Sequence, residues 1–172
     1  LLPTKFVKFI KFAPMKPEII LPTPLNPRVP APTQPFRTVL PLQIRFNDID
    51  LLGHVNNEMY FAYMDLGKMR YFQEMMDDKL DWRAINTVVA NVNCDFYAPT
   101  TIDEQICVIT AITHIGESSF RLEQRIVDID TGDVKCIGRT VMVTIDPATG
   151  HSVPVDPDWV RRVSEFEGRE YR

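Results

Sequence analysis

Residues 45–60 read Arg-Phe-Asn-Asp-Ile-Asp-Leu-Leu-Gly-His-Val-Asn-Asn-Glu-Met-Tyr, and this stretch decides how the rest of the chain is interpreted. A short run of β-type apolar residues, within residues 39–46, ends inside it. Residues 57–76 contain neither proline nor a turn cluster, and their apolar residues recur at helical spacings. The stretch therefore predicts a strand-to-helix connection that carries two aspartates, Asp48 and Asp50, just before the helix starts.

The predicted helix is apolar on two neighbouring faces. One face contains Val55, Met59, Ala62, Leu66 and Met69, and the other contains Tyr60, Tyr63, Met64, Gly67 and Tyr71. Together the two faces cover most of the circumference, and a helix that is apolar nearly all round is typical of a buried position. We therefore expect other elements of the fold to enclose this helix. Gly67 would allow an enclosing sheet to approach its backbone closely.

Four long strands are expected after the helix, separated by turn residues. They span residues 84–97, 105–115, 118–129 and 134–145. Connections this short cannot carry the crossovers of a parallel sheet, so consecutive strands should mostly pair as antiparallel hairpins. A short closing helix is expected from Pro157 onward. The whole pattern predicts an α+β domain with one long helix against an antiparallel sheet.

Composition divides the chain near residue 37. Ten of the fourteen prolines lie within residues 1–41, and a segment so rich in proline cannot build a helix or a central strand. Residues 1–40 contain six lysines and arginines against one glutamate, a net charge of +5, which leaves −9 for the remaining chain. We therefore predict a basic, proline-rich N-terminal arm, residues 1–36, followed by one folded domain, residues 37–172.

Three interpretations fit the start of this arm, in which Phe6, Phe9, Ile10 and Phe12 stand among lysines. It could be a targeting peptide, an amphipathic helix on a membrane surface, or a segment packed on its own domain or on a partner subunit. We expect the packed arm, with these four side chains buried, because its positive charge is opposite to that of the body. Membrane contact by the arm stays open as the rival interpretation.

Composition also disfavours several classes of protein. No apolar run approaches the roughly 18 uncharged residues that a membrane span requires. Cys94, Cys107 and Cys136 lie far apart in the sequence without a CxxC pair or a Cys/His cluster, so we expect free core thiols, no metal site and no cofactor. A reducing, cytoplasmic location is the default prediction for such a chain. The acidic body argues against nucleic acid as a partner.

Two later segments, residues 95–99 (Asp-Phe-Tyr-Ala-Pro) and 115–120 (Ile-Gly-Glu-Ser-Ser-Phe), complete a pattern that starts with residues 45–60. These motifs resemble the 4-hydroxybenzoyl-CoA thioesterase-like branch of the hotdog superfamily, over roughly residues 38–155. The resemblance implies a hotdog fold, in which a curved antiparallel sheet wraps one long central helix. The run His-Val-Asn-Asn is also similar to plant acyl-ACP thioesterases, in which an aspartate four residues before the histidine is catalytic. That position is Asp50 here.

The resemblance implies hydrolysis of an acyl thioester, carried by CoA or by acyl carrier protein, to a free acid and a thiol. Asp50 would act as a base that activates water or as a nucleophile that forms an acyl anhydride. His54 would orient the reactants, and backbone amides at the helix start, up to Asn57, would hold the oxyanion. The plant enzymes carry an asparagine where this chain has Leu52, so their full catalytic set does not transfer. The substrate-binding residues would be Gly53, Val55, Asn56, Tyr60 and Tyr63.

Ordinary structural roles compete with this interpretation. Aspartate is common before helices as a cap, and Asp48 fits that role, or an ion pair with Arg45, better than Asp50 does. Asn56 and Asn57 are both candidates for the helix N-cap, and we expect at least one of them to do only that.

Two other functions stay open from the sequence. One is a hotdog dehydratase or hydratase, which would use a histidine such as His54 with an acidic partner. The other is a non-catalytic protein that binds acyl thioesters. For either function, as for the hydrolase, the family resemblance implies a homodimer or a dimer of dimers with the site at the subunit junction.

Overall fold

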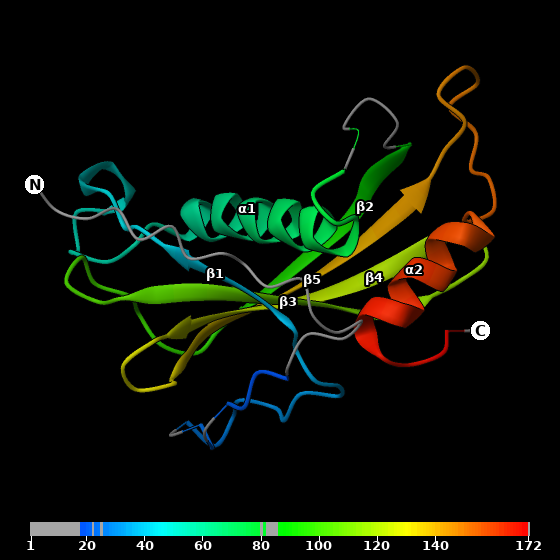
Figure 1. Cartoon of the computed structure of the whole chain (residues 1–172). Helices are drawn as coiled ribbons and strands as arrows, with labels where there is room; N and C mark the ends of the chain where they lie inside the picture. Colours follow the sequence, from blue (N-terminus) through cyan, green and yellow to red (C-terminus); the bar gives the residue numbers. More distant parts are fainter. Residues whose placement is uncertain (1–17, 22, 25, 80, 82–85, 172) are drawn as a thin grey trace, which may run out of the picture.

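A computed structural model gives the fold of the chain (Figure 1) and describes residues 18–171 apart from residues 22, 25, 80 and 82–85. The predicted burial of the apolar residues between 6 and 12 lies outside these described residues. The elements in chain order are β1 (Thr38–Leu42), a short 3-10 turn (Phe46–Asp48), α1 (Asn57–Met75), β2 (Thr87–Phe96), β3 (Ile106–Ile115), β4 (Ser119–Asp128), β5 (Val134–Thr144) and α2 (Pro157–Glu167).

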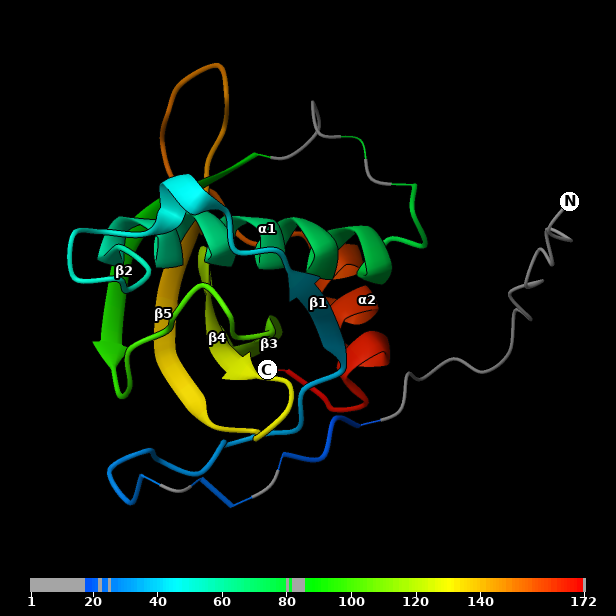
Figure 2. The same cartoon turned by 90° about the vertical axis from the view of Figure 1, so that its left-hand side faces the viewer.

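The five strands form one antiparallel sheet in the order β1-β3-β4-β5-β2. Figure 2 shows that the sheet is curved and that α1 lies along its concave side. This arrangement confirms the predicted α+β hotdog fold. Strands β3, β4 and β5 form consecutive hairpins as expected, but β2 and β3 do not. Because residues 97–105 are not a tight turn, β2 pairs with β5 at the far edge instead.

One face of α1 packs against the sheet. Its buried residues include Tyr60, Tyr63, Met64, Gly67 and Tyr71. At Gly67 the helix and the sheet are so close that a Cβ atom would lie 2.8 Å from Gln124 Nε2 and from Val108. The Gln124 side chain also donates a hydrogen bond of 2.7 Å to the Met64 carbonyl oxygen. The close approach predicted at Gly67 is therefore confirmed.

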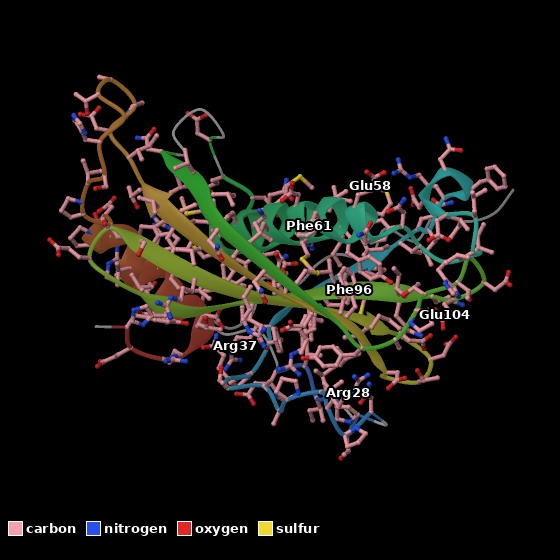
Figure 3. The ribbon with its side chains drawn as sticks, turned by 180° about the vertical axis from the view of Figure 1, so that it is seen from behind. Arg28, Arg37, Glu58, Phe61, Phe96 and Glu104 are labelled. Carbon is pink, nitrogen blue, oxygen red and sulfur yellow. The ribbon has the colours of Figure 1, made fainter. Side chains whose placement is uncertain are left out.

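The opposite face of α1 is not enclosed, so the prediction of a helix buried all round is wrong for the single chain. Phe61, Leu66 and Met69 on this face are 40%, 44% and 37% exposed. The neighbouring edge strand β2 exposes Val92 and Phe96 as well. Figure 3 looks at this side of the molecule, with Phe61 on α1 and Phe96 on β2 labelled. The physical reason is that the sheet covers only one side of α1.

The described part of the arm, residues 18–36, runs along the outer face of the sheet, opposite α1 (Figures 1 and 2). Val29 and Phe36 are buried against outward-facing side chains of β3, β4 and β5. Arg125 on β4 donates a hydrogen bond of 2.9 Å to the Pro30 carbonyl oxygen. Packing of the arm on its own domain is thus confirmed for this part. The division into an arm and a domain stays a prediction.

The helix α2 closes one end of the core. Asp156 caps its first turn, Pro157 begins it, and the chain leaves it at Gly168, whose φ of 67° is left-handed. Trp159 and Val163 pack in one apolar cluster with the C-terminal end of α1. No helix in the described part of the chain is long and apolar enough to cross a membrane.

Candidate active site

The connection between β1 and α1 first places Asp48 inside the protein. Its carboxylate accepts hydrogen bonds from the Arg45 guanidinium at 2.9 Å and from the Tyr63 hydroxyl at 2.6 Å. Burial alone would raise the pKa of Asp48, but the bonds from Arg45 and Tyr63 outweigh it and hold that pKa below its ordinary value. The ion pair between Asp48 and Arg45, one of the structural roles expected from the sequence, is confirmed.

Asp50 lies two residues further on, at the start of a turn. Its Oδ1 accepts hydrogen bonds from the backbone N–H groups of Leu52 and His54 at 2.8 and 3.2 Å. Gly53 completes the turn with a φ of 79°, a left-handed conformation that favours glycine. No hydrogen bond reaches Asp50 Oδ2 from any residue that the structure describes. One carboxylate oxygen therefore shapes the loop while the other is available for chemistry.

Asp50 borders an open groove of about 630 Å³. The helix-start residues His54, Val55, Asn56, Asn57 and Tyr60 line it, together with residues 96–99 at the end of β2 and just beyond it. The Tyr60 ring meets the Phe96 ring edge-to-face with 5.1 Å between centroids, and the Tyr60 hydroxyl donates to Thr100 Oγ1 at 2.9 Å. Burial raises the pKa of Tyr60, so this hydroxyl keeps its proton at neutral pH.

The backbone amides of the helix start are the second feature of the groove. Four of the five amides between Gly53 and Asn57 have acceptors nearby: Gly53 binds Asp50 O, His54 binds Asp50 Oδ1, Val55 binds Thr100 O and Asn56 binds Asp48 O. The Asn57 N–H has no acceptor in the described part of the chain. It stands at the first position of α1, where the helix dipole is positive. Only this amide of the five is available to an oxyanion.

The structure brings most of the predicted site residues together. Asp50, His54, Val55, Asn56, Asn57 and Tyr60 all line the groove. Gly53 and Tyr63 do not, because Gly53 turns the loop and the Tyr63 hydroxyl is bound to Asp48. Asn56 is the N-cap of α1, since its Oδ1 accepts a hydrogen bond from Glu58 N at 3.2 Å. One of the two asparagines therefore has the capping role expected of it.

The site residues predicted from the sequence did not include the second wall of the groove, residues 96–99. The signal was present, because these residues belong to the Asp-Phe-Tyr-Ala-Pro segment that carries part of the family resemblance. Thr100 was missed as well. Its carbonyl and hydroxyl oxygens accept hydrogen bonds from Val55 N and from the Tyr60 hydroxyl, and they join the two walls.

A second cavity, of about 390 Å³, lies at the other end of α1. Its lining includes Phe72, Met75, Phe120 and Trp159, with charged side chains from the start of α2. It contains none of the residues predicted for the site. Within the described residues, no group of three or more His, Cys, Asp or Glu side chains is arranged to hold a metal ion.

Comparison with known proteins places this geometry in a family. A family profile described as the thioesterase-like superfamily matches residues 44–163, which is more than half of the chain. The chain belongs to the thioesterase-like superfamily. A solved thioesterase of Thermus thermophilus, complexed with coenzyme A and Zn, is 30% identical to it. The similarity covers 78% of this chain and 96% of that one, with a TM-score of 0.70.

Two further proteins are similar to the chain. Slr0204 of Synechocystis, a 1,4-dihydroxy-2-naphthoyl-CoA thioesterase, shares the fold with a TM-score of 0.63 at 17% identity, over 73% of this chain and 93% of its own. The uncharacterized protein YsmA of Bacillus subtilis is 27% identical over 114 residues, 65% of this chain and 75% of its own. Membership supports thioester hydrolysis as the general activity. The resemblance to plant acyl-ACP thioesterases stays a prediction from the sequence.

Proposed function

We propose that this chain hydrolyses an acyl-CoA to a free acid and CoA, with Asp50 as its catalytic carboxylate. The observation that carries the proposal is Asp50 on the groove wall, whose carboxylate Oδ2 has no hydrogen-bond donor among the described residues. Asn57, whose backbone amide is equally unused, lines the same groove. The residue with a free carboxylate oxygen and the residue with an unused amide therefore line one groove, and they offer the base and the oxyanion donor that thioester hydrolysis uses.

In the proposed reaction, Asp50 Oδ2 takes a proton from water as the water oxygen adds to the thioester carbonyl carbon. The Asn57 N–H and the positive end of α1 hold the negative charge that develops on the carbonyl oxygen. Collapse of the tetrahedral intermediate breaks the C–S bond, and the leaving thiolate takes the proton back from Asp50. His54, on the same wall, orients water or substrate. In the second possible route, Asp50 attacks the carbonyl carbon itself and water then cleaves the anhydride.

CoA is the proposed carrier because the Thermus relative, at 30% identity over most of its length, was solved with coenzyme A. The groove offers an apolar wall to the acyl part, formed by Val55, Phe96, Ala98 and Pro99. Acyl carrier protein is the alternative carrier. Thiol release from matched acyl-CoA and acyl-carrier-protein substrates distinguishes the two.

The proposal is tested by following thiol release from saturated acyl-CoAs of increasing length. Release of free CoA with production of the free acid supports the hydrolase. A hydratase or dehydratase cannot release CoA from a saturated substrate, and a non-catalytic binder would bind it without turnover. Neither result would be compatible with the proposal. A single turnover in heavy-oxygen water then tests for the second route: label in the Asp50 carboxylate requires the anhydride, whereas label in the free acid alone is compatible with both routes.

We also propose a homodimer, or a dimer of such dimers, that forms through β2. As an edge strand, β2 has backbone groups open to another strand, and its Val88, Val89, Val92 and Phe96 side chains are all more than a third exposed. The uncovered face of α1 adds Phe61, Leu66 and Met69 beside it. A second copy related by a two-fold axis presents the same strand and the same apolar face. Pairing of the two β2 strands would cover the exposed strand edge and the apolar face of α1 in each copy. It would also extend the open groove at the subunit junction.

The mass of the protein in solution tests the dimer. Leu66→Glu should shift the population toward monomer, because the glutamate would be buried in the proposed interface. Ile129→Glu is a matched control, since Ile129 is similarly exposed but lies at the turn between β4 and β5. A wild-type monomer, or equal effects of both substitutions, would contradict the interface.

We propose a cytoplasmic location, which the state of the cysteines supports. Cys94, Cys107 and Cys136 are all free thiols. Free thiols persist in reducing compartments, so the cytoplasm is the proposed location. Cell fractionation of the tagged protein checks it.

A further inference from the structure

Two cysteines that are distant in the sequence meet between the sheet and α1. Cys94 is on β2 and Cys136 on β5, and their Sγ atoms are 2.9 Å apart. In the register of the two strands, Cys94 lies opposite Gly138 and Phe96 lies opposite Cys136. The cysteines are therefore diagonal neighbours whose side chains share one face of the sheet.

The packing around the pair keeps the sulfur atoms together. Gly138 has no side chain to separate them, and the Met64 thioether of α1 fills the space that a Cβ at Gly138 would need. Both cysteines belong to the apolar cluster that contains Val55 and Tyr60 of the groove. A covalent disulfide is about 2.05 Å long, so the sulfur atoms need to approach by less than about 1 Å.

The two thiols differ in reactivity. A hydrogen bond from the Cys136 thiol lowers the pKa of Cys94, whereas the same bond and burial raise the pKa of Cys136. Cys94 is also the less buried of the two and lies on the edge strand. The third cysteine, Cys107, is buried on the outer face of the sheet, and burial raises its pKa to about 11. The most readily ionised thiol of the chain thus has a partner already in contact.

We propose that Cys94 and Cys136 form a reversible cross-strand disulfide by exchange with a low-molecular-weight disulfide. The Cys94 thiolate attacks one sulfur of the small disulfide, which forms a mixed disulfide and expels one small thiolate. That thiolate takes the proton of Cys136, and the Cys136 sulfur then attacks Cys94 and expels the second small thiolate. The protein dithiol is oxidised by two electrons, and the small disulfide is reduced to two thiols.

The disulfide would tie the edge strand β2 to β5 beside the groove. Phe96 stands two residues after Cys94, lines the groove and contacts the Tyr60 ring. The disulfide would therefore constrain one wall of the groove in a redox-dependent way. In a reducing compartment such disulfides are transient and mark oxidising conditions. The inference does not depend on Asp50 or on thioester hydrolysis, so it stands or falls separately from the proposed function.

The test uses the full chain, equilibrated with increasing ratios of oxidised to reduced glutathione and then treated with an alkylating agent under denaturing conditions. We expect a species that carries one alkyl group, where the reduced protein with its three cysteines carries three, and whose non-reduced peptides link Cys94 to Cys136. Dithiothreitol should reverse it, and Cys107 should be alkylated throughout. Thiols that stay free over the whole range, a stable glutathione adduct on the wild type, or a link through Cys107 would overturn the proposal.

Substitutions test the order of the two steps. Cys136→Ser removes the resolving thiol, so glutathione should stay attached to Cys94. Cys94→Ser should prevent both the internal link and the adduct, and it keeps the proposal testable if the buried Cys136→Ser variant does not fold. Cys107→Ser is the matched control and should form the link as the wild type does. An adduct on Cys136 in Cys94→Ser, formed as fast as the wild-type link, would contradict the assigned order.

Discussion

The two aspartates of the connection between β1 and α1 stand two residues apart and differ in nearly every contact. The Asp48 carboxylate is buried and is bound by Arg45 and Tyr63. The Asp50 carboxylate is half-buried, holds a turn with one oxygen and leaves the other open to the groove. Residue type is the same, so the shape of the loop creates the difference. A carboxylate whose bonds are all made holds structure, whereas one with an unused oxygen can take part in chemistry.

The largest expected effect is on hydrolysis, at Asp50. Asp50→Asn should lower turnover by at least ~100-fold, the scale of a lost general base. The asparagine keeps an Oδ1 acceptor for the Leu52 and His54 amides, so the turn should survive. Thiol release from an acyl-CoA measures the loss, and the midpoint of thermal unfolding checks the fold. A folded Asp50→Asn variant with wild-type turnover would contradict the role of Asp50 as the catalytic carboxylate.

The next effect is on stability, at Asp48. Asp48→Ala should lower the free energy of unfolding by ~2–3 kcal/mol, because it leaves the buried Tyr63 hydroxyl without its acceptor. Loss of the bond from Arg45 adds little, since that side chain is 66% exposed. Urea denaturation measures the change. Turnover per folded molecule should fall far less than in Asp50→Asn, and equal losses at the two positions would erase the contrast between them.

The same contrast predicts a pH dependence of stability. The pKa of Asp48 is lower in the folded protein than its ordinary value, which is about 3.9 in an unfolded chain. The folded state therefore gains stability from the ionised carboxylate above that value, and it loses this gain as pH falls through the folded-state pKa. The stability difference between wild type and Asp48→Asn should be constant near neutral pH and shrink below about pH 4. If the stability difference between wild type and Asp48→Asn grew as the pH fell, the pKa of Asp48 would be raised in the folded protein, which would contradict the prediction.

Local patterns in the sequence predicted the helices and strands, and the family resemblance implied their hotdog arrangement. Helical spacing located α1, turn residues bounded the strands, and Gly67 indicated the close approach to the sheet. The surroundings of α1 were not predictable in the same way. Leu66 and Met69 are as apolar as the buried face, and a hydropathy pattern does not distinguish the side covered by the sheet from the side left exposed in the single chain.

The candidate site was only partly predictable, for a similar reason. Residues 50–57 are contiguous, so their motif alone was enough to group them. The opposite wall, residues 96–99, comes from the end of β2, and its place beside Tyr60 depends on the order of strands in the sheet. The contact between Cys94 and Cys136 depends on the register of β2 and β5. Which backbone amides of the loop are already hydrogen-bonded, four of the five, depends on hydrogen-bond geometry. None of these is encoded in local spacing.

The smallest expected effect concerns Asn56, the helix cap that is bonded to Asp48. Asn56 caps α1 with its side chain, and its N–H donates to the Asp48 carbonyl oxygen at 2.8 Å. Asn56→Ala should cost ~1 kcal/mol of stability, as a lost N-cap usually does. Asp156→Ala removes the same kind of cap from α2, away from the groove, and should cost about as much. Only Asn56→Ala should also lower kcat/KM, by several-fold, because a frayed first turn misplaces the Asn57 N–H. Urea denaturation and thiol release on both variants provide the comparison, and equal losses of hydrolysis in the two would mean that the start of α1 has no special part in the reaction.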